Sequence, residues 1–189
     1  MERRRYVIVM AAGSGTRMGG SLPKQFLEIG GKAILQKTIE VFLEACPGIS
    51  VVTVLNSDYI QYWRDYCLKH NFTCPQTIVA GGFTRFHSVR NALEKIPEGA
   101  VVAVHDGVRP LVTPSLVREM FGNVAEIPAL IPVVPCVDTL KVLQKDGDEL
   151  RTVEGAVADR SVLYAAQTPQ IFHSELLKSA YSMAYDTMF

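Results

Sequence analysis

Short runs of apolar residues alternate along the chain with segments in which apolar residues recur every three or four positions. An unbroken apolar run is typical of a strand that helices cover on both faces of a sheet. The predicted strands are 6–10, 51–55, 77–80, 100–104 and, bracketed by prolines, 130–134.

The periodic segments between these runs predict amphipathic helices. The first spans 34–46 and ends at Pro47-Gly48. Ser57 and Asp58 are suitable N-caps for the second, and Thr84 precedes the third. The apolar positions that we expect these two helices to bury are Ile60, Trp63, Cys67 and Leu68, and then Phe86, Val89, Leu93 and Ile96.

Alternation of strands and helices predicts an α/β fold, with a mainly parallel, Rossmann-like sheet flanked by helices. Ligands of such sheets bind beyond the carboxyl ends of the strands. This rule brings three distant segments to one edge, namely the glycine loop after residue 10, Gly81-Gly82 and His105-Asp106. We therefore expect the chemistry of the protein at that edge.

The segment 138–167 has a different pattern. Residues 139–143 are strand-like, and the sequence 145–148 contains an Asp-Gly turn signal, so we predict an antiparallel β-arm that projects from a single domain of residues 1–189. Exposed strand edges need a partner, and a homodimer made through the arm would supply one.

Composition limits the classes of partner and compartment. Nineteen basic residues balance nineteen acidic ones, so bulk charge predicts no nucleic-acid partner. The four cysteines show no zinc-like spacing, and no apolar run approaches the roughly 18 residues of a membrane span. The basic start followed by about seven apolar residues resembles a short signal peptide, but glycines end it and no cleavage-type segment follows. We expect a cytoplasmic protein without membrane partners.

The glycine loop fails the spacing of both common nucleotide motifs. In G-x-G-x-x-G, Gly13 and Gly15 fit but Met18 occupies the third place, and no Gly-Lys-Ser/Thr follows at the Walker A distance. What remains is a loop of small residues whose backbone N–H groups can surround an anion, with Arg17 and Lys24 as cations. Two cations suit a triphosphate better than a dinucleotide, although a surface loop with incidental cations is the alternative.

Five motifs then occur in order: A-A-G-S-G-T-R-M-G…P-K-Q-F, A-G-G-x-x-R-x-x-S-V-x-N-A-L, V-x-V-H-D-x-V-R-P, D-T-L-K and Q-T-P-Q-x-F. Together they resemble the 2-C-methyl-D-erythritol 4-phosphate cytidylyltransferase family, over nearly the whole chain. The resemblance implies a GT-A-like nucleotidyltransferase fold, transfer of a cytidylyl group from CTP to a sugar-alcohol phosphate in nonmevalonate isoprenoid synthesis, release of pyrophosphate, Mg²⁺ as cofactor and a homodimer.

The resemblance also implies roles for residues that match the family's motifs. Catalysis is implied for Arg17, Lys24 and Arg160, the last from the neighbouring subunit. CTP contacts are implied for Ala11, Ala12, Gly13, Ser14, Gly15, Thr16, Gly81, Gly82, Ser88 and Asp106. Contacts to the sugar-alcohol phosphate are implied for Asp106, Arg109, Thr139, Lys141, Arg160 and Thr168. Asp106 is also the implied protein ligand of Mg²⁺, which the CTP phosphates would mainly hold.

Other readings of the polar residues near this edge are weaker. A Ser88–His87–Asp106 hydrolase triad is set aside because adjacent helical residues do not face each other and no nucleophile elbow is present. His105 fits a packed histidine at a strand end. Arg85, one turn before Ser88, either assists at the site or is a solvated helix charge.

The family pattern continues beyond the last residue, with a further strand that carries a second lysine for the substrate phosphate. We expect that a C-terminal piece is missing from this sequence. Two other functions stay open: ribitol-5-phosphate cytidylyl transfer, which shares the glycine loop and the H-D-x-V-R-P motif, and a catalytically silent CTP-binding module. D-T-L-K favours the isoprenoid enzyme, because Lys141 belongs to its substrate arm.

Overall fold

The computed structural model describes residues 3–13, 22–124 and 126–186. The chain forms two compact units, the first made of Met1–Leu130 with Thr168–Phe189 and the second of Ile131–Gln167. The first unit contains β1 (Arg5–Ala11), η2 (Lys24–Phe26), β2 (Glu28–Ile29), β3 (Lys32–Ala33), α1 (Ile34–Ala45), β4 (Ser50–Leu55), η3 (Ser57–Tyr59), α2 (Ile60–Lys69), β5 (Gln76–Ala80), α3 (Arg85–Leu93), β6 (Val101–Asp106), α4 (Pro114–Asn123), β7 (Ala129–Leu130), β12 (Gln170–His173) and α5 (Ser174–Asp186).

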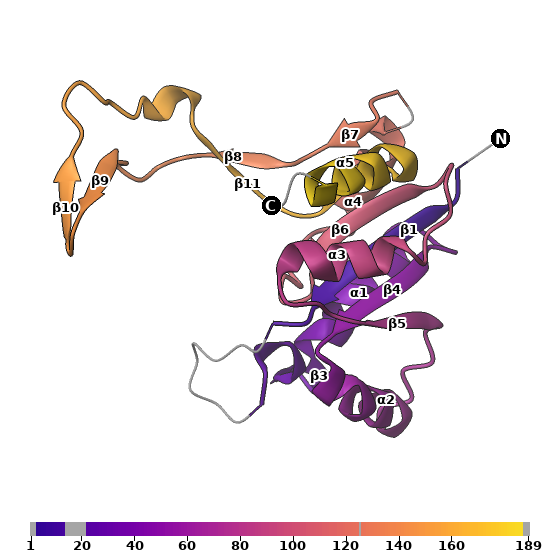
Figure 1. Ribbon diagram of the computed structural model, residues 1–189. Coiled ribbons are helices and arrows are strands. Elements are labelled where there is room, and N and C mark those ends of the chain that lie inside the picture. Colours follow the sequence, from indigo (N-terminus) through magenta and orange to yellow (C-terminus); the bar gives the residue numbers. More distant parts are fainter. Residues whose placement is uncertain (1–2, 14–21, 125, 187–189) are drawn as a thin grey trace. The chain divides into compact units, whose positions relative to one another are not determined.

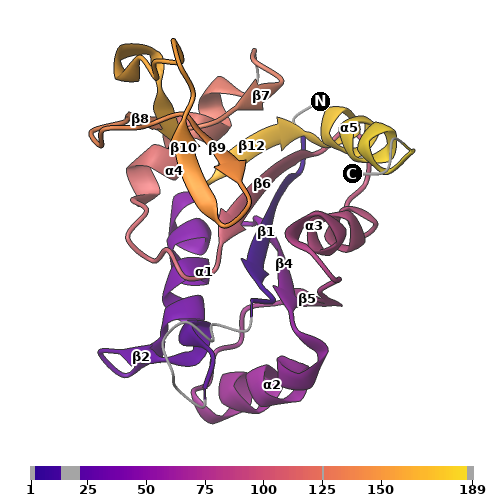
Figure 2. The same ribbon diagram turned by 60° about the vertical axis from the view of Figure 1, so that its left-hand side comes forward.

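The main sheet has the strand order β5-β4-β1-β6-β12-β7. The strands β5, β4, β1 and β6 are parallel (Figure 1). β12 pairs antiparallel with β6, and β7 pairs antiparallel with β12 (Figure 2). The predicted α/β class and mainly parallel sheet are therefore confirmed. The chain moves from β1 to β4 on one side and reaches β6 on the other, so the strand order reverses at β1, the position where such sheets bind ligands.

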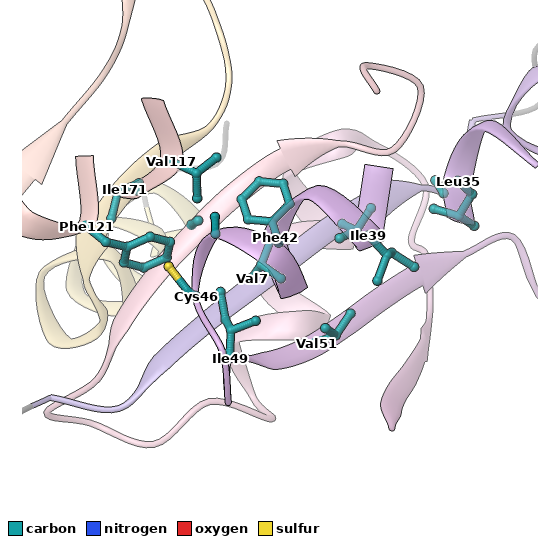
Figure 3. Close-up of a cluster of buried hydrophobic side chains, with 14 of the residues drawn as sticks. Val7, Leu35, Ile39, Phe42, Cys46, Ile49, Val51, Val117, Phe121 and Ile171 are labelled. Atoms are coloured by element: carbon teal, nitrogen blue, oxygen red, sulfur yellow. The ribbon is translucent and has the colours of Figure 1, made fainter. Parts of the chain in front are cut away.

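Helices cover both faces of this sheet, as continuous apolar strands require. One core lies between the sheet and α1, α2 and α4, and the other lies between the sheet and α3 and α5 (Figure 2). In the first core, Ile39 and Phe42 of α1 belong to the same buried cluster as Val7 of β1 (Figure 3). All three side chains are fully buried, so β1 is a rigid base for the loop that follows it.

The sequence located the first elements well but misassigned the start of the second predicted helix. Asn56, not Ser57 or Asp58, is the cap, because its side chain accepts a hydrogen bond from the Asp58 N–H at 3.0 Å. A 3₁₀ turn over 57–59 then precedes α2. Leu68, predicted to be buried, is 81% exposed, since only part of this short helix faces the sheet.

The second unit contains β8 (Val133–Pro135) paired antiparallel with β11 (Tyr164–Ala166), the hairpin of β9 (Leu143–Asp146) and β10 (Glu149–Thr152), and η4 (Arg160–Val162). The predicted arm 138–167 lies within this unit, which begins earlier, at Ile131. The hairpin loop is Gly147-Asp148, and Gly147 has φ +61° at its first position, as a type II′ turn requires.

Two strand predictions near this unit were wrong. The predicted strand 130–134 is two short strands in different sheets, because β7 pairs with β12 and β8 pairs with β11 around Pro132. The predicted strand 139–143 begins only at Leu143. Over the residues described, the longest apolar helices fall short of what a membrane crossing needs.

Candidate active site

The strand register brings the three predicted segments to one edge of the sheet. Met10 of β1 lies opposite Asp106 of β6, and Ala11 lies opposite Leu55 of β4. Leu55 in turn lies opposite Ala80, the last residue of β5. The segments that follow Ala11, Ala80 and Asp106 therefore leave the sheet side by side, and the predicted convergence is confirmed.

A cleft of about 640 Å³ opens at this edge. Among the predicted site residues, Ala11, Ala12, Gly13, Lys24, Gly82, Ser88 and Asp106 line it. Its other lining residues are Met10, Gln25, Phe83, Thr84, Arg85 and Val108. Gly81 lines a smaller neighbouring pocket together with Ala12 and Gly82. Residues of the first and second motifs thus face one space.

Gln25 ties the two ends of the first loop together. Its buried side-chain amide donates hydrogen bonds to the carbonyl oxygens of Ala11 at 2.8 Å and Gly13 at 3.0 Å. Its neighbour Lys24 lines the cleft. From the sequence, Gln25 was assigned no role. Its only signal was its place beside Lys24 in the first motif, and nothing in that pattern says that its side chain turns back to β1.

The remaining predicted residues of this loop, Ser14, Gly15, Thr16 and Arg17, lie outside the described residues. Downstream of them, Phe26 anchors the turn that carries Lys24. Its buried ring packs against Tyr62 and Tyr59, with ring centroids 4.9 and 5.5 Å apart, and near Trp63. This aromatic cluster joins the turn to η3 and α2, so the backbone of Lys24 is held by the core.

Gly81 and Gly82 are required by close packing. A Cβ atom at Gly81 would lie 2.5 Å from the Cβ of Ala12, and one at Gly82 would lie 2.4 Å from the Cβ of His87. The N–H of Gly82 donates to Ser88 Oγ at 3.0 Å. Gly81 thus lets the loop after β5 approach the loop after β1, and Gly82 lets it approach α3, where Ser88 in the first turn holds it.

Asp106 is held between two arginines. Its carboxylate contacts Arg85 Nη1 at 2.7 Å and Arg109 Nε at 2.8 Å. Burial raises the pKa of Asp106, but the hydrogen bonds and charges of Arg109 and Arg85 outweigh burial and lower the pKa below its ordinary value. Asp106 is therefore an anion at neutral pH. Arg85, which the sequence left undecided, belongs to this charge cluster.

His105 is a packed histidine, as expected. Its fully buried ring lies 5.0 Å from that of Phe42, and Nε2 is 3.1 Å from the carbonyl oxygen of Arg109. Burial lowers the pKa of His105 to about 4, so the ring is neutral at pH 7. His105 shapes the loop that carries Arg109 and faces the core.

Thr168 lies beside Asp106, so the chain returns to this edge of the sheet just before β12. Its hydroxyl oxygen accepts a hydrogen bond from the Asp106 N–H at 3.4 Å. Thr139, Lys141 and Arg160 belong to the second unit, in which Asp159 precedes the short turn η4 that includes Arg160. There the Asp159 carboxylate accepts hydrogen bonds from the N–H and hydroxyl of Ser161.

Within the described ranges, no three His, Cys, Asp or Glu side chains gather as metal ligands. Asp106 offers one carboxylate in the cleft, and both of its oxygens are engaged by arginines. Mg²⁺ commonly binds through one or two carboxylates together with substrate phosphates and waters. Among the described lining residues, Asp106 is therefore the one carboxylate that a cation in the cleft could use.

Comparisons with known proteins agree on one family. The family model of 2-C-methyl-D-erythritol 4-phosphate cytidylyltransferase matches residues 6–188. A protein of that name from Porphyromonas gingivalis is 41% identical over 191 residues, which span 100% of this chain and 81% of the relative. Another from Bacteroides thetaiotaomicron is 39% identical over 183 residues, which span 97% and 80%.

Solved structures give the same result. The crystal structure of 4-diphosphocytidyl-2C-methyl-D-erythritol synthase from Anaerococcus prevotii has a TM-score of 0.79 and 25% identity, with 99% of this chain and 77% of that chain covered. The structure of 2-C-methyl-D-erythritol 4-phosphate cytidylyltransferase from Thermus thermophilus has a TM-score of 0.69 and 27% identity, with 100% and 79% covered.

Proposed function

The chain belongs to the 2-C-methyl-D-erythritol 4-phosphate cytidylyltransferase family, and from this premise we infer that it transfers the cytidylyl group of CTP to methylerythritol phosphate. The products are CDP-methylerythritol and pyrophosphate. The observation that carries this inference is the family match over residues 6–188, together with the cleft that the motifs of that match line.

For the triphosphate, we propose that backbone N–H groups of residues 11–16 surround the phosphates while Arg17 and Lys24 supply positive charge. Small residues let an anion approach the backbone closely, and Ala11, Ala12 and Gly13 line the cleft beside Lys24. Lys24 and Arg17 stabilise the charge that develops at the α-phosphorus in the transition state. The tether from Gln25 to Ala11 and Gly13 supports this role, because it keeps the loop and the lysine in register.

For the cytidine, Gly81, Gly82 and Ser88 provide backbone groups and a hydroxyl to the base. Close backbone donors and acceptors can read a pyrimidine edge, and the tight packing at both glycines supports such an approach. Asp106 and Arg109 face the ribose and the acceptor substrate. The two arginine contacts of Asp106 keep it ionised, ready to accept hydrogen bonds from hydroxyl groups.

The chemical step is an in-line attack by a phosphate oxygen of methylerythritol phosphate on the α-phosphorus of CTP. The new phosphorus–oxygen bond forms as the bond from the α-phosphorus to its bridging oxygen breaks, and pyrophosphate leaves. No general base is needed, because a phosphate monoester is already ionised near pH 7. Positioning and electrostatic stabilisation supply most of the acceleration.

For the acceptor, we propose that Thr168 acts together with Thr139, Lys141 and Arg160 of the second unit, and that Arg160 reaches the site of a neighbouring subunit. The homodimer would form through the second unit. Its support is the exposure of many large apolar side chains in this small unit, which a partner would cover: Val133, Val134, Val137, Leu140, Val142, Leu143, Leu150, Val153, Val157, Val162 and Tyr164.

We also propose Mg²⁺ as the cofactor and the cytoplasm as the compartment. Mg²⁺ would be held mainly by the CTP phosphates and would neutralise their charge. Asp106 would exchange one of its arginine contacts for a contact to Mg²⁺.

The proposed compartment rests on the cysteines. All four cysteines are free, which suits a reducing compartment.

The function is tested by pyrophosphate release from CTP, measured with methylerythritol phosphate and with ribitol 5-phosphate in separate reactions. We expect release with methylerythritol phosphate only. Release with ribitol 5-phosphate alone would reassign the substrate. CTP binding without release in either reaction would indicate a silent nucleotide-binding module.

A further inference from the structure

Phe83 is a large apolar residue whose side chain is 100% exposed at the mouth of the cleft. It lines the cleft and also the neighbouring pocket of about 290 Å³, in which Gly81 and Asn56 are other lining residues. The residues common to both spaces are Ala12, Gly82 and Phe83. The ring thus stands where the two spaces meet.

The backbone on both sides of Phe83 is fixed. The N–H of Gly81 donates to the carbonyl oxygen of Leu55 at 2.7 Å, and the N–H of Gly82 donates to Ser88 Oγ at 3.0 Å. On the other side, the hydroxyl of Thr84 caps α3 by accepting a hydrogen bond from the His87 N–H. The loop therefore presents the ring from a fixed backbone, and the ring lies perpendicular to that of His87, with 6.3 Å between centroids.

From this arrangement we propose that Phe83 packs its ring against the pyrimidine base of bound CTP and shields it from water. The proposal rests on the proposed function, since it takes the occupant of the cleft to be CTP. Covering an exposed phenylalanine removes apolar surface from water, and an aromatic ring stacks on the face of any base. Stacking would complement the glycines and Ser88, which can reach only the edge of the base.

Stacking on the base makes a specific kinetic prediction. The ring lies on the mouth loop and carries no charge, so it would bind CTP equally in the ground state and the transition state. Removing it should then raise KM for CTP and leave kcat unchanged. Phosphate contacts would also be untouched, so inhibition by inorganic tripolyphosphate, which has no base, should stay the same.

The test compares the wild-type protein with Phe83→Ala, Phe83→Trp and the control Leu68→Ala, which removes a side chain that is 81% exposed on α2. We expect Phe83→Ala to weaken CTP binding by about tenfold, within the range for one base–aromatic stack. Its kcat, its thermal stability and its inhibition by tripolyphosphate should match the wild type. Leu68→Ala should change none of these quantities.

Phe83→Trp provides an independent readout. The chain has a single tryptophan, Trp63, which is fully buried, so the new indole would report on the mouth of the cleft against a constant background. We expect this variant to retain CTP affinity within about twofold, as an aromatic replacement should, and to lose fluorescence when CTP is added.

Unchanged CTP affinity in Phe83→Ala, beside normal binding by the wild type, would overturn the proposal and leave the function intact. Equal weakening of CTP and tripolyphosphate would also overturn it, because the effect would then lie in the phosphate site. A wild-type protein that binds no CTP would instead overturn the proposed function together with this inference.

Discussion

At the scale of single residues, the site depends on side chains that never need to touch substrate. Gln25 is the clearest example, because its amide bonds to Ala11 and Gly13 connect the start of the loop to Lys24. We predict that Gln25→Ala lowers kcat, since Lys24 and the loop lose their common register. It should also cost about 1–3 kcal/mol of unfolding free energy, because the two carbonyl groups lose a buried donor.

Steady-state kinetics at a temperature where the variant is folded, together with urea unfolding, measure both effects. Lys24→Ala gives the largest loss of kcat that displacing Lys24 could cause, and we expect this loss to be on the order of 10²–10³ by analogy with a removed oxyanion-hole donor. Gln61→Ala is the matched control, because the Gln61 amide bonds the exposed Asp65 on its own helix, away from the cleft. A Gln25→Ala variant with wild-type kcat would show that the tether serves stability alone.

At the scale of elements, the N-terminus of α5 carries a negative charge whose contribution to stability can be measured. Glu175, in the first turn, contacts Arg3 Nη1 at 2.7 Å and accepts a hydrogen bond from the Gly99 N–H. Its own backbone N–H, and then Arg3, lower the pKa of Glu175 to about 2. A carboxyl whose folded-state pKa is depressed stabilises the fold above its unfolded value of about 4.3, and this contribution is lost as the pH falls towards 2.

We therefore predict that Glu175→Gln lowers the unfolding free energy at pH 7 by at most about 1 kcal/mol, since the side chain is partly exposed and water screens the pair. The difference from the wild type should shrink between pH 4.5 and pH 2.5. Urea unfolding at several pH values measures it, with Glu44→Gln on α1 as the control for loss of a surface carboxylate. A difference that is constant over this range would contradict the assignment.

The elements also show what the sequence could and could not predict. Strands β1, β4 and β6 were predictable because each is a largely apolar run that is buried between helices on both faces of the sheet. The apolar run at 130–134 was wrongly predicted as one strand, because apolar content does not reveal which sheet a strand joins. The run is divided at Pro132 between the main sheet and the β8–β11 sheet. Asn56 was missed as a cap because its neighbours Ser57 and Asp58 are equally good capping residues.

For the site too, the sequence predicted positions better than contacts. Ala12, Gly82 and Asp106 could be placed at one edge because parallel strands end there together, whereas Ser88 was assigned through the family resemblance. The ion pairs of Asp106 could not be predicted, since the one with Arg85 depends on how α3 sits over the end of β6 and the one with Arg109 depends on the turn that follows β6. Motifs thus located the chemistry, whereas the contacts that set its charge state required the structure.

At the scale of the whole molecule, the proposed dimer predicts that residues of two subunits share one active site. If Arg160 acts on the partner's site, Lys24 and Arg160 of any one site come from different chains. Lys24→Ala and Arg160→Ala should each be nearly inactive alone. In a mixed dimer, however, one site would combine the intact Lys24 of one chain with the intact Arg160 of the other.

Mixing the two variants in equal amounts, with time for subunits to exchange, should therefore restore about a quarter of wild-type activity, because half of the dimers are mixed and one of their two sites is intact. Sedimentation velocity establishes the dimer, and each variant mixed with itself is the control. If Arg160 acted within its own chain, every mixed dimer would carry two damaged sites and no activity would return. Restored activity would place Arg160 in the site of the neighbouring subunit. It would also identify a second copy of this chain as the partner that covers the exposed apolar side chains of the second unit.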